Sequence, residues 1–302
     1  MLYDVIIVGG SFAGLSAAMQ LARAQRRVLL VDAGRPRNRF AEASHGFLGQ
    51  DGAAPAAIVR EGLRQLSAYP TVDFVDGQAV AARAAGEAFA VDLGEAGVAE
   101  GRRLVLATGL IDDLPLPSMP LRWGVSVLHC PYCHGYEVRG RRLAVIANHP
   151  MAAHQAMLLP DWGPTTFFTQ GEFEPTEAEA AQLSARGVAI ERTPVVELLG
   201  DAPRTEALRL ADGRAIAADA VFTAPRTRVA SPLAEQLGCA FEAGPTGPFI
   251  EVDGAKQTSV PGVFAAGDAA QAMHNATLAS AAGVLAGVSA HRSLVMAQAG
   301  SR

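Results

Sequence analysis

Residues 3–14 read YDVIIVGGSFAG, and this stretch decides the fold of the N-terminal part of the chain. Val5–Val8 has the uninterrupted apolar pattern of a buried strand, and a helical pattern begins after the glycines. Gly9 permits a tight turn, a small residue at Ser11 lets the backbone approach a pyrophosphate, and Gly14 lets the helix pack closely on the strand. Because the first amides of such a helix can donate to phosphates, the stretch predicts a dinucleotide-binding turn. The alternative is a tight turn in an α/β protein with no ligand.

Further strand ends carry residues suited to the same kind of site. The strand Val28–Val31 ends at Asp32, the distance expected for a carboxylate that accepts hydrogen bonds from a ribose. Leu104–Gly109 and Gly262–Asp268 are strand patterns that end in small-residue turns, and the second closes on an acid. The combination of strand, turn, helix and acid favours a bound dinucleotide over an empty turn.

Residues 130–134 read CPYCH and hold two of the three cysteines. Thiols two residues apart can form a disulfide without long-range rearrangement, and the imidazole of His134 can take or return the proton that thiol chemistry moves. A structural zinc site needs four ligands, and the remaining cysteine, Cys239, has no histidine at finger spacing, so we expect no metal site. We expect Cys239 to be a small buried residue.

The composition bounds the class of protein. A chain of 302 residues that is half apolar predicts about two domains with ample core. The formal charge of -5 and the lack of a long basic block indicate neither a nucleic-acid surface nor an anionic-membrane surface. Lys256 is the only lysine, which disfavours a P-loop or a Schiff-base site.

Two apolar segments resemble membrane anchors. Asp4 rather than a basic flank precedes Val5–Ala22, and glycines interrupt it, so we expect strand, turn and helix. Residues 272–290 hold His274, Asn275 and many small residues, which predict a tightly packed helix beside a cofactor or a subunit partner. With no targeting segment, we expect a cytoplasmic protein.

The N-terminal turn, the turn at 107–109, the segment ending in Asp268 and the CxxC together make the chain resemble the two-domain pyridine-nucleotide/disulfide flavoproteins along essentially its whole length. It is most similar to the low-molecular-weight thioredoxin reductase type. The resemblance implies an α/β fold of two Rossmann-like, three-layer ββα domains. It implies a discontinuous FAD-binding domain, 1–113 and 239–302, and an inserted NAD(P)H-like domain, 114–238, that carries the CxxC. FAD is the implied cofactor and a homodimer the implied assembly.

The resemblance also implies roles for single residues. Asp32 would bind the adenosine ribose and Asp268 the ribityl chain of the flavin, while Cys133 would face the flavin and Cys130 would exchange with substrate. The implied cofactor-binding residues are Gly9, Ser11, Phe12, Ala13, Gly14, Asp32, Ala33, His45, Val80, Ala107, Thr108, Gly109, Cys133, Gly267 and Asp268. For His45 two alternatives stay open, a position facing the flavin or substrate channel and a loop histidine bonded to backbone.

The second nucleotide turn departs from the family pattern. The turn expected to bind NADPH reads ANHPMA at 147–152. His149 stands where a glycine lets the backbone approach a pyrophosphate, and Pro150 removes an amide near the helix start. Residues 170–172 stand where NADPH-using relatives carry basic side chains, so a phosphate there would meet glutamates instead of arginines. We therefore expect the inserted domain to keep its fold without the nucleotide.

The redox motif indicates a branch within the family. Residues 130–137, CPYCHGYE, carry His134 where a typical reductase has an acid, and together with 44–52, SHGFLGQDG, they look like the branch containing dithiol oxidases of small natural products. That branch implies attack of a substrate thiolate on the Cys130–Cys133 disulfide, followed by electron transfer to FAD and oxygen. We expect His134 to be the acid/base, and the alternative is a residue that caps a helix start.

Three functions remain open on the sequence. We favour an FAD-dependent oxidation of a dithiol to a disulfide with oxygen as acceptor and without NADPH. The second candidate is reduction of a thioredoxin-like or similar disulfide, fed by NADPH or by a protein donor such as ferredoxin. The third is a flavin redox sensor or electron-transfer module without turnover. The expected partner is a small dithiol or disulfide, or a thioredoxin-like protein.

Overall fold

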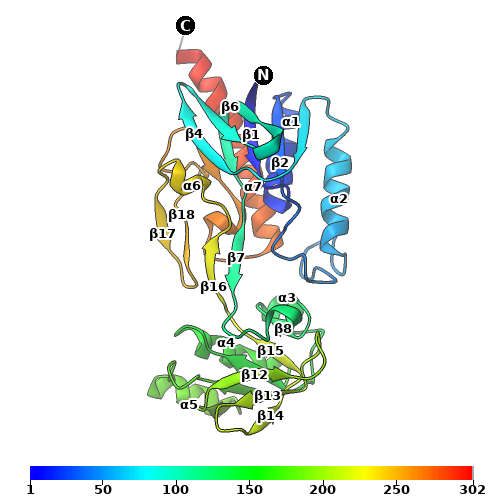
Figure 1. The fold of residues 1–302 in the computed structure, drawn as a ribbon, viewed down its shortest axis with the longest axis vertical. Coiled ribbons are helices and arrows are strands. Elements are labelled where there is room, and N and C mark those ends of the chain that lie inside the picture. The colour runs from blue at the N-terminus through cyan, green and yellow to red at the C-terminus, as the bar shows by residue number, and fades with distance from the viewer. Residues whose placement is uncertain (301–302) are drawn as a thin grey trace. The chain divides into compact units, whose positions relative to one another are not determined.

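The computed structural model describes residues 1–300 of the chain. The chain packs as two compact units (Figure 1). Unit 1 contains Met1–Arg39, Ala56–Ile111 and Arg228–Arg302, and unit 2 contains Phe40–Pro55 and Asp112–Thr227.

The unit borders differ from the predicted domain borders in two places. Residues 40–55 were expected in the FAD-binding domain and belong to unit 2. Residues 228–238 were expected in the inserted domain and belong to unit 1, because Leu233 and Ala234 of α6 (Leu233–Gln236) are buried in its core.

A largely parallel sheet forms the middle of unit 1. Its strands follow the order β3-β2-β1-β6-β5-β4, and β19 also pairs with β6. β1 is parallel to both β2 and β6, whereas β4 and β5 are antiparallel additions. The strands of this sheet are β1 (Leu2–Val8), β2 (Val28–Asp32), β3 (Val72–Asp76), β4 (Ala81–Ala85), β5 (Ala88–Asp92), β6 (Val98–Leu106) and β19 (Val263–Ala265).

The two faces of this sheet are buried by different elements. Because side chains alternate along a strand, Val5 and Ile7 of β1 join one core while Ile6 and Val8 join the other. α1 (Phe12–Arg23) and α7 (Ala276–Gly300) supply the first core, and α6 with the strands β17 (Phe241–Ala243) and β18 (Pro248–Ile250) contributes to the second. α2 (Pro55–Leu66) completes the helices of this unit.

Helices α1 and α7 approach closely because small residues line their contact. A Cβ on Gly283 would lie 2.1 Å from the carbonyl oxygen of Ala13, and one on Gly287 would lie 2.6 Å from that of Ala17. Length and composition alone would let Ala276–Ala297 cross a membrane, with 39% of the most apolar window buried. The predicted tightly packed helix is therefore present, and its buried side meets α1.

Unit 2 repeats the layered plan at smaller size. Its parallel sheet has the order β11-β10-β9-β15-β8, and an antiparallel sheet has the order β12-β13-β14. Phe167 packs with α4 and α5 on one face, whereas Phe168 packs with the antiparallel sheet on the other. Both units thus have the predicted three-layer ββα arrangement.

The elements of unit 2 are short. They are β8 (Val127–Leu128), α3 (Pro131–His134), β9 (Leu143–Ile146), α4 (Ala152–Leu158), β10 (Thr165–Phe168), α5 (Glu177–Ala185), β11 (Ala189–Glu191), β12 (Val195–Leu199), β13 (Ala207–Leu210), β14 (Ala215–Ala217) and β15 (Ala220–Phe222). The chain passes between the units at each end of residues 40–55, within β7 (Leu110–Asp113) and within β16 (Arg226–Val229). β7 and β16 pair as a two-stranded sheet.

Candidate functional site

The predicted dinucleotide turn lies where four strands of unit 1 end. The register pairs Val8 with Val31 and with Leu106, and Leu106 with Ala265, so β1, β2, β6 and β19 finish at one edge of the sheet. In open α/β sheets, ligands bind at the carboxyl ends of the strands. The four sequence segments predicted to form the site are therefore brought together.

Three glycines allow this edge to close. Gly9 has φ +109°, and a Cβ there would lie 2.1 Å from the carbonyl oxygen of Ala107. A Cβ on Gly10 would lie 2.7 Å from the Cβ of Asp32, and one on Gly14 would overlap the carbonyl oxygen of Gly9. The turn can therefore approach both neighbouring strand ends only without side chains at these positions.

The polar groups of this edge fit a dinucleotide. Among the described residues, the carboxylate of Asp32 receives no hydrogen bond, and the hydroxyl of Thr108 is buried without a partner. Ser11 begins α1 as its N-cap residue, yet its hydroxyl makes no capping hydrogen bond. A buried hydroxyl without a partner is unfavourable, so these groups suit hydrogen bonds to a ligand's ribose and phosphates.

Asp268 lies in the 3-10 turn η4 (Gly267–Ala270) and has a partner that the sequence did not indicate. Its carboxylate accepts a hydrogen bond of 2.9 Å from Arg37, and both side chains are largely buried. A Cβ on Gly267 would lie 2.9 Å from that of Ala13, so η4 adjoins the glycine turn. Arg37 belongs to the run RPRNR at 35–39 after β2, and this basic cluster was the only available signal for it.

The two cysteines of the redox motif lie together in unit 2. Cys130 is the N-cap residue of α3, and the Sγ atoms of Cys130 and Cys133 are 2.7 Å apart. The hydrogen bond from Cys133, together with the amides of Cys133 and Tyr132, lowers the pKa of Cys130 to about 7, although burial opposes this. The hydrogen bond to Cys130 and burial raise the pKa of Cys133. Cys130 is thus the better nucleophile of the pair.

His134 ends α3 and is not a capping residue. Both ring nitrogens are buried, and within residues 1–300 neither has a hydrogen-bond partner, which contradicts the capping alternative. Burial lowers the pKa of His134, Glu137 raises it and His45 lowers it. The imidazole is therefore held neutral near pH 7 and can accept a proton.

The second nucleotide turn is filled by its own side chain. His149 lies between β9 and α4 and is buried, and its Nδ1 accepts a hydrogen bond of 3.2 Å from the amide of Met151. Burial lowers the pKa of His149, and nearby Arg226 lowers it further. Pro150 has no amide hydrogen, and the Met151 amide already donates to His149. Neither of the two residues before α4 can therefore donate a hydrogen bond to a phosphate.

The end of β10 is tied to neighbouring segments. The side chain of Gln170 bonds both the amide and the carbonyl of Val195, and Thr169 donates a hydrogen bond to Glu174. Arg192 lies near this turn, which the sequence pattern did not indicate, but its guanidinium pairs with Glu174 at 3.0 Å. Arg192 is thus already paired with a carboxylate.

The remaining predicted residues occupy varied positions. His45 lies in unit 2, beside His134 rather than in the glycine turn, and its role toward a flavin stays a prediction. Val80 follows β3, and its amide donates to the carbonyl of Asp92. Cys239 is buried, as predicted, and donates a weak hydrogen bond of 3.6 Å to Thr258. Asn275 accepts hydrogen bonds from the amides of Thr277 and Leu278, so it caps the start of α7.

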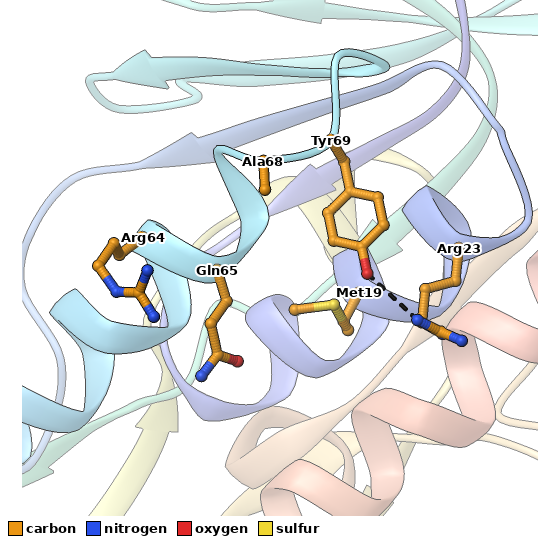
Figure 2. Close-up of a pocket in the computed structure, with 6 residues that line it drawn as sticks. All are labelled: Met19, Arg23, Arg64, Gln65, Ala68 and Tyr69. Atoms are coloured by element: carbon orange, nitrogen blue, oxygen red, sulfur yellow. Dashed lines mark hydrogen bonds between the residues drawn. The ribbon is translucent and has the colours of Figure 1, made fainter.

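A separate surface pocket lies away from the glycine turn (Figure 2). Its lining residues come from the C-terminal half of α1 and from the end of α2 with the turn after it: Met19, Arg23, Arg64, Gln65, Ala68 and Tyr69. Arg23 donates to the hydroxyl of Tyr69 (Figure 2), and Arg64 pairs with Glu61. Its polar groups are thus satisfied within the protein. Among residues 1–300, no cluster of three or more metal-ligating side chains is found.

Comparison with known proteins gives consistent results. The family model described as pyridine nucleotide-disulphide oxidoreductase matches residues 3–146 and 167–283. The chain is 33% identical over 304 residues to thioredoxin reductase tcpT of Claviceps purpurea, covering 97% of this chain and 94% of that protein. The matched segments leave out residues 147–166, which contain the turn of His149 and α4.

Two solved structures are similar in both fold and sequence. An oxidoreductase from Agrobacterium tumefaciens has 49% identity and a TM-score of 0.93, covering 98% of this chain and 99% of that one. The structure of HlmI has 37% identity and a TM-score of 0.91, covering 99% of this chain and 94% of that one.

Proposed function

The chain belongs to the pyridine nucleotide-disulphide oxidoreductase family, and from that premise we propose that it oxidises a dithiol to a disulfide with oxygen as acceptor and without NADPH. Its general activity is that of an FAD-dependent disulfide oxidoreductase of thioredoxin reductase-like type. The glycine turn, Asp32, Thr108 and Asp268 would hold the FAD.

The turn between β9 and α4 is the observation that carries the proposal. The buried ring of His149 accepts the hydrogen bond of the Met151 amide, and Pro150 offers none. A dinucleotide phosphate would have to displace this side chain and would still lack one donor. The arginine beside the next strand end, Arg192, is paired with Glu174. This turn is therefore poorly suited to bind NADPH, which favours a thiol as the source of electrons.

The cysteine pair carries the thiol chemistry of this proposal. A substrate thiolate attacks Sγ of Cys130, the S–S bond to Cys133 breaks, and Cys133 leaves as a thiolate. The second substrate thiol then attacks the mixed disulfide, which releases the product disulfide and reduced Cys130. His134 accepts a thiol proton during this exchange. FAD, when bound, takes the two electrons of the dithiol and passes them to oxygen, which becomes hydrogen peroxide.

The partners and assembly are part of the same proposal. The substrate is a small dithiol, with a thioredoxin-like protein as the other candidate, and the protein acts in the cytoplasm. A homodimer is supported by α7, whose exposed side includes large apolar side chains: Leu278, Val284, Leu285, Val288, Val295 and Met296. Their spacing of three, four and seven residues places many of them along one side of the helix.

Disulfide reduction is the second candidate, because relatives that cover almost the whole chain bear the name thioredoxin reductase. For this candidate the thiol–disulfide exchange proceeds in the opposite direction, and the reduced cysteine pair reduces a protein disulfide. The electron donor would be NADPH bound weakly, or a protein such as ferredoxin. A protein donor would not need to bind at the turn of His149, so the blocked turn does not count against disulfide reduction with such a donor.

The test is anaerobic reduction of the FAD-loaded protein, followed by its visible absorption. We expect dithiothreitol to bleach the flavin rapidly, NADPH to leave it unchanged, and air to restore the colour with formation of peroxide. A Cys130→Ser variant that retains FAD is the matched control and should resist dithiothreitol. Rapid bleaching by NADPH would instead establish the reductase.

A further inference from the structure

The acid/base proposed at the redox motif has no visible route for its proton. Both nitrogens of His134 are buried and lack hydrogen-bond partners in the part of the chain that the structure describes. A group that accepts a proton in every catalytic cycle must also give it up again, and in the proposed reaction the dithiol protons finally reach peroxide, directly or by way of solvent. The chain around His134 must therefore supply an outlet.

His45 lies beside His134 with a carboxylate at each of its ring nitrogens. The two imidazole rings meet edge to face with their centroids 6.5 Å apart. Nδ1 of His45 lies 3.6 Å from Asp51, and its Nε2 lies 3.6 Å from Glu137. Among the described residues the His134 nitrogens have no hydrogen-bond partner, so the two rings make no direct hydrogen bond and a proton that passes between them needs a bridging water.

Exposure to solvent rises step by step along these groups. The His134 nitrogens are buried, the His45 side chain is 22% exposed, Glu137 is 39% exposed and Asp51 is 72% exposed. Two arms thus lead from the buried imidazole to the surface. One runs within the segment of the redox motif, and the other runs through the loop of residues 40–55.

The loop is built to hold its arm in place. The amide of Gly46 donates a hydrogen bond of 2.9 Å to Asp51, on the same oxygen that faces His45. Ser44 receives the amide of Gly52 and donates its own to Ala53, which closes the loop at its base. Asp51 therefore stays opposite His45 even though its side chain is exposed.

We propose that His45 is a positioning residue that relays the proton of His134 to Glu137 and Asp51, a role that deepens the proposed function and rests on it. An S–H bond breaks as a proton joins a nitrogen of His134. That N–H proton passes, through one water, to His45, and from His45 to a carboxylate oxygen and then to bulk water. Each transfer breaks one bond to hydrogen and forms one, and no electrons move.

A purely structural contact is the competing explanation, since a histidine between two carboxylates can also fasten the loop. Three variants separate the two: His45→Gln, His45→Ala and, as matched control, His154→Gln. His154 is an exposed histidine of unit 2 outside the cluster. Each protein is first checked for bound FAD and for its circular dichroism.

Single-turnover bleaching by dithiothreitol under argon, measured from pH 6 to pH 9, is the first readout. We expect His45→Gln to lower the rate constant about tenfold or more, and His154→Gln to leave it unchanged. Added imidazole should restore the rate of His45→Ala in proportion to its concentration. A rate for His45→Gln within twofold of wild type, or a loss in His45→Ala that imidazole does not restore, would overturn the relay.

Histidine NMR provides a readout that depends on neither substrate nor electron donor. The ring proton of His134 is assigned with His134→Gln and titrated in wild type, in Glu137→Gln and in His45→Gln. Loss of His45 should raise the pKa of His134 and loss of the Glu137 charge should lower it, because these two groups act on it in opposite directions. If wild type is not bleached by dithiothreitol, the proposed function fails while this titration still decides whether the groups are coupled. An unchanged His134 titration in both variants would overturn the relay.

Discussion

The thiol of Cys130 should ionise near neutrality. Its pKa is lowered to about 7, chiefly by the hydrogen bond from Cys133, so the thiolate fraction should rise through pH 7. We expect the iodoacetamide reaction rate of the reduced protein at Cys130, read by mass spectrometry, to follow this ionisation. In Cys133→Ala the donated hydrogen bond is gone, and the midpoint should move to higher pH. The same midpoint in both proteins would show that Cys133 is not the cause.

Single residues divide into those that a local pattern predicts and those that need the fold. Asp32 could be placed from its spacing, because a strand, a turn and a second strand fix its position. Arg37 could not be paired with Asp268, since 231 residues separate them. The buried state of the His134 nitrogens was equally inaccessible, because it depends on neighbours far along the chain.

At the scale of elements, the contact between α1 and α7 should be sensitive to a single side chain. A Cβ on Gly283 would lie 2.1 Å from the backbone oxygen of Ala13, which cannot rotate away. We expect Gly283→Val to lower the free energy of unfolding by about 1–3 kcal/mol. The matched control is Ala281→Val, which adds a β-branched side chain at an exposed position of the same helix. Equal melting temperatures for the two variants would contradict this packing.

Strands could be predicted more closely than the loop between them. β9 covers Leu143–Ile146, because a short apolar run that follows two arginines and ends before a turn is typical of a buried strand. Residues 40–55 carry no periodic pattern, so nothing in the sequence assigned them to unit 2. Their place depends on contacts such as Phe40 against Gly124, where a Cβ would come within 3.0 Å of the Phe40 backbone.

At the scale of the whole molecule, the exposed apolar side of α7 should hold two copies of the chain together. We expect wild type to elute in size-exclusion chromatography with light scattering at twice the chain mass of 31.4 kDa. Placing charges in the contact, with Leu285→Glu and Val288→Glu together, should yield monomers. Val196→Glu, an equally exposed apolar position on β12, is the control. A monomeric wild type would contradict the proposed dimer, and a double variant that stays dimeric would contradict a contact through α7.

The whole-molecule plan could be predicted because both units repeat one layered arrangement with its own sequence signals. The absence of a glycine turn after β9 indicated a changed site but could not reveal how the space is filled. Only the fold shows the ring of His149 buried there and holding the Met151 amide. In the proposed function, selectivity against NADPH thus depends on the position of one side chain and not on composition.

The order of segments in unit 1 also bears on how the protein is made. α1 ends at Arg23, whereas the helix that covers it begins at Ala276, so roughly 250 residues must leave the ribosome between them. At synthesis rates of about 5–20 residues per second, the apolar face of α1 stays unpacked for about 10–50 s before α7 is synthesised. During that interval the nascent chain exposes a face rich in alanine and leucine, and chaperones that bind such surfaces would have their longest access to this protein then.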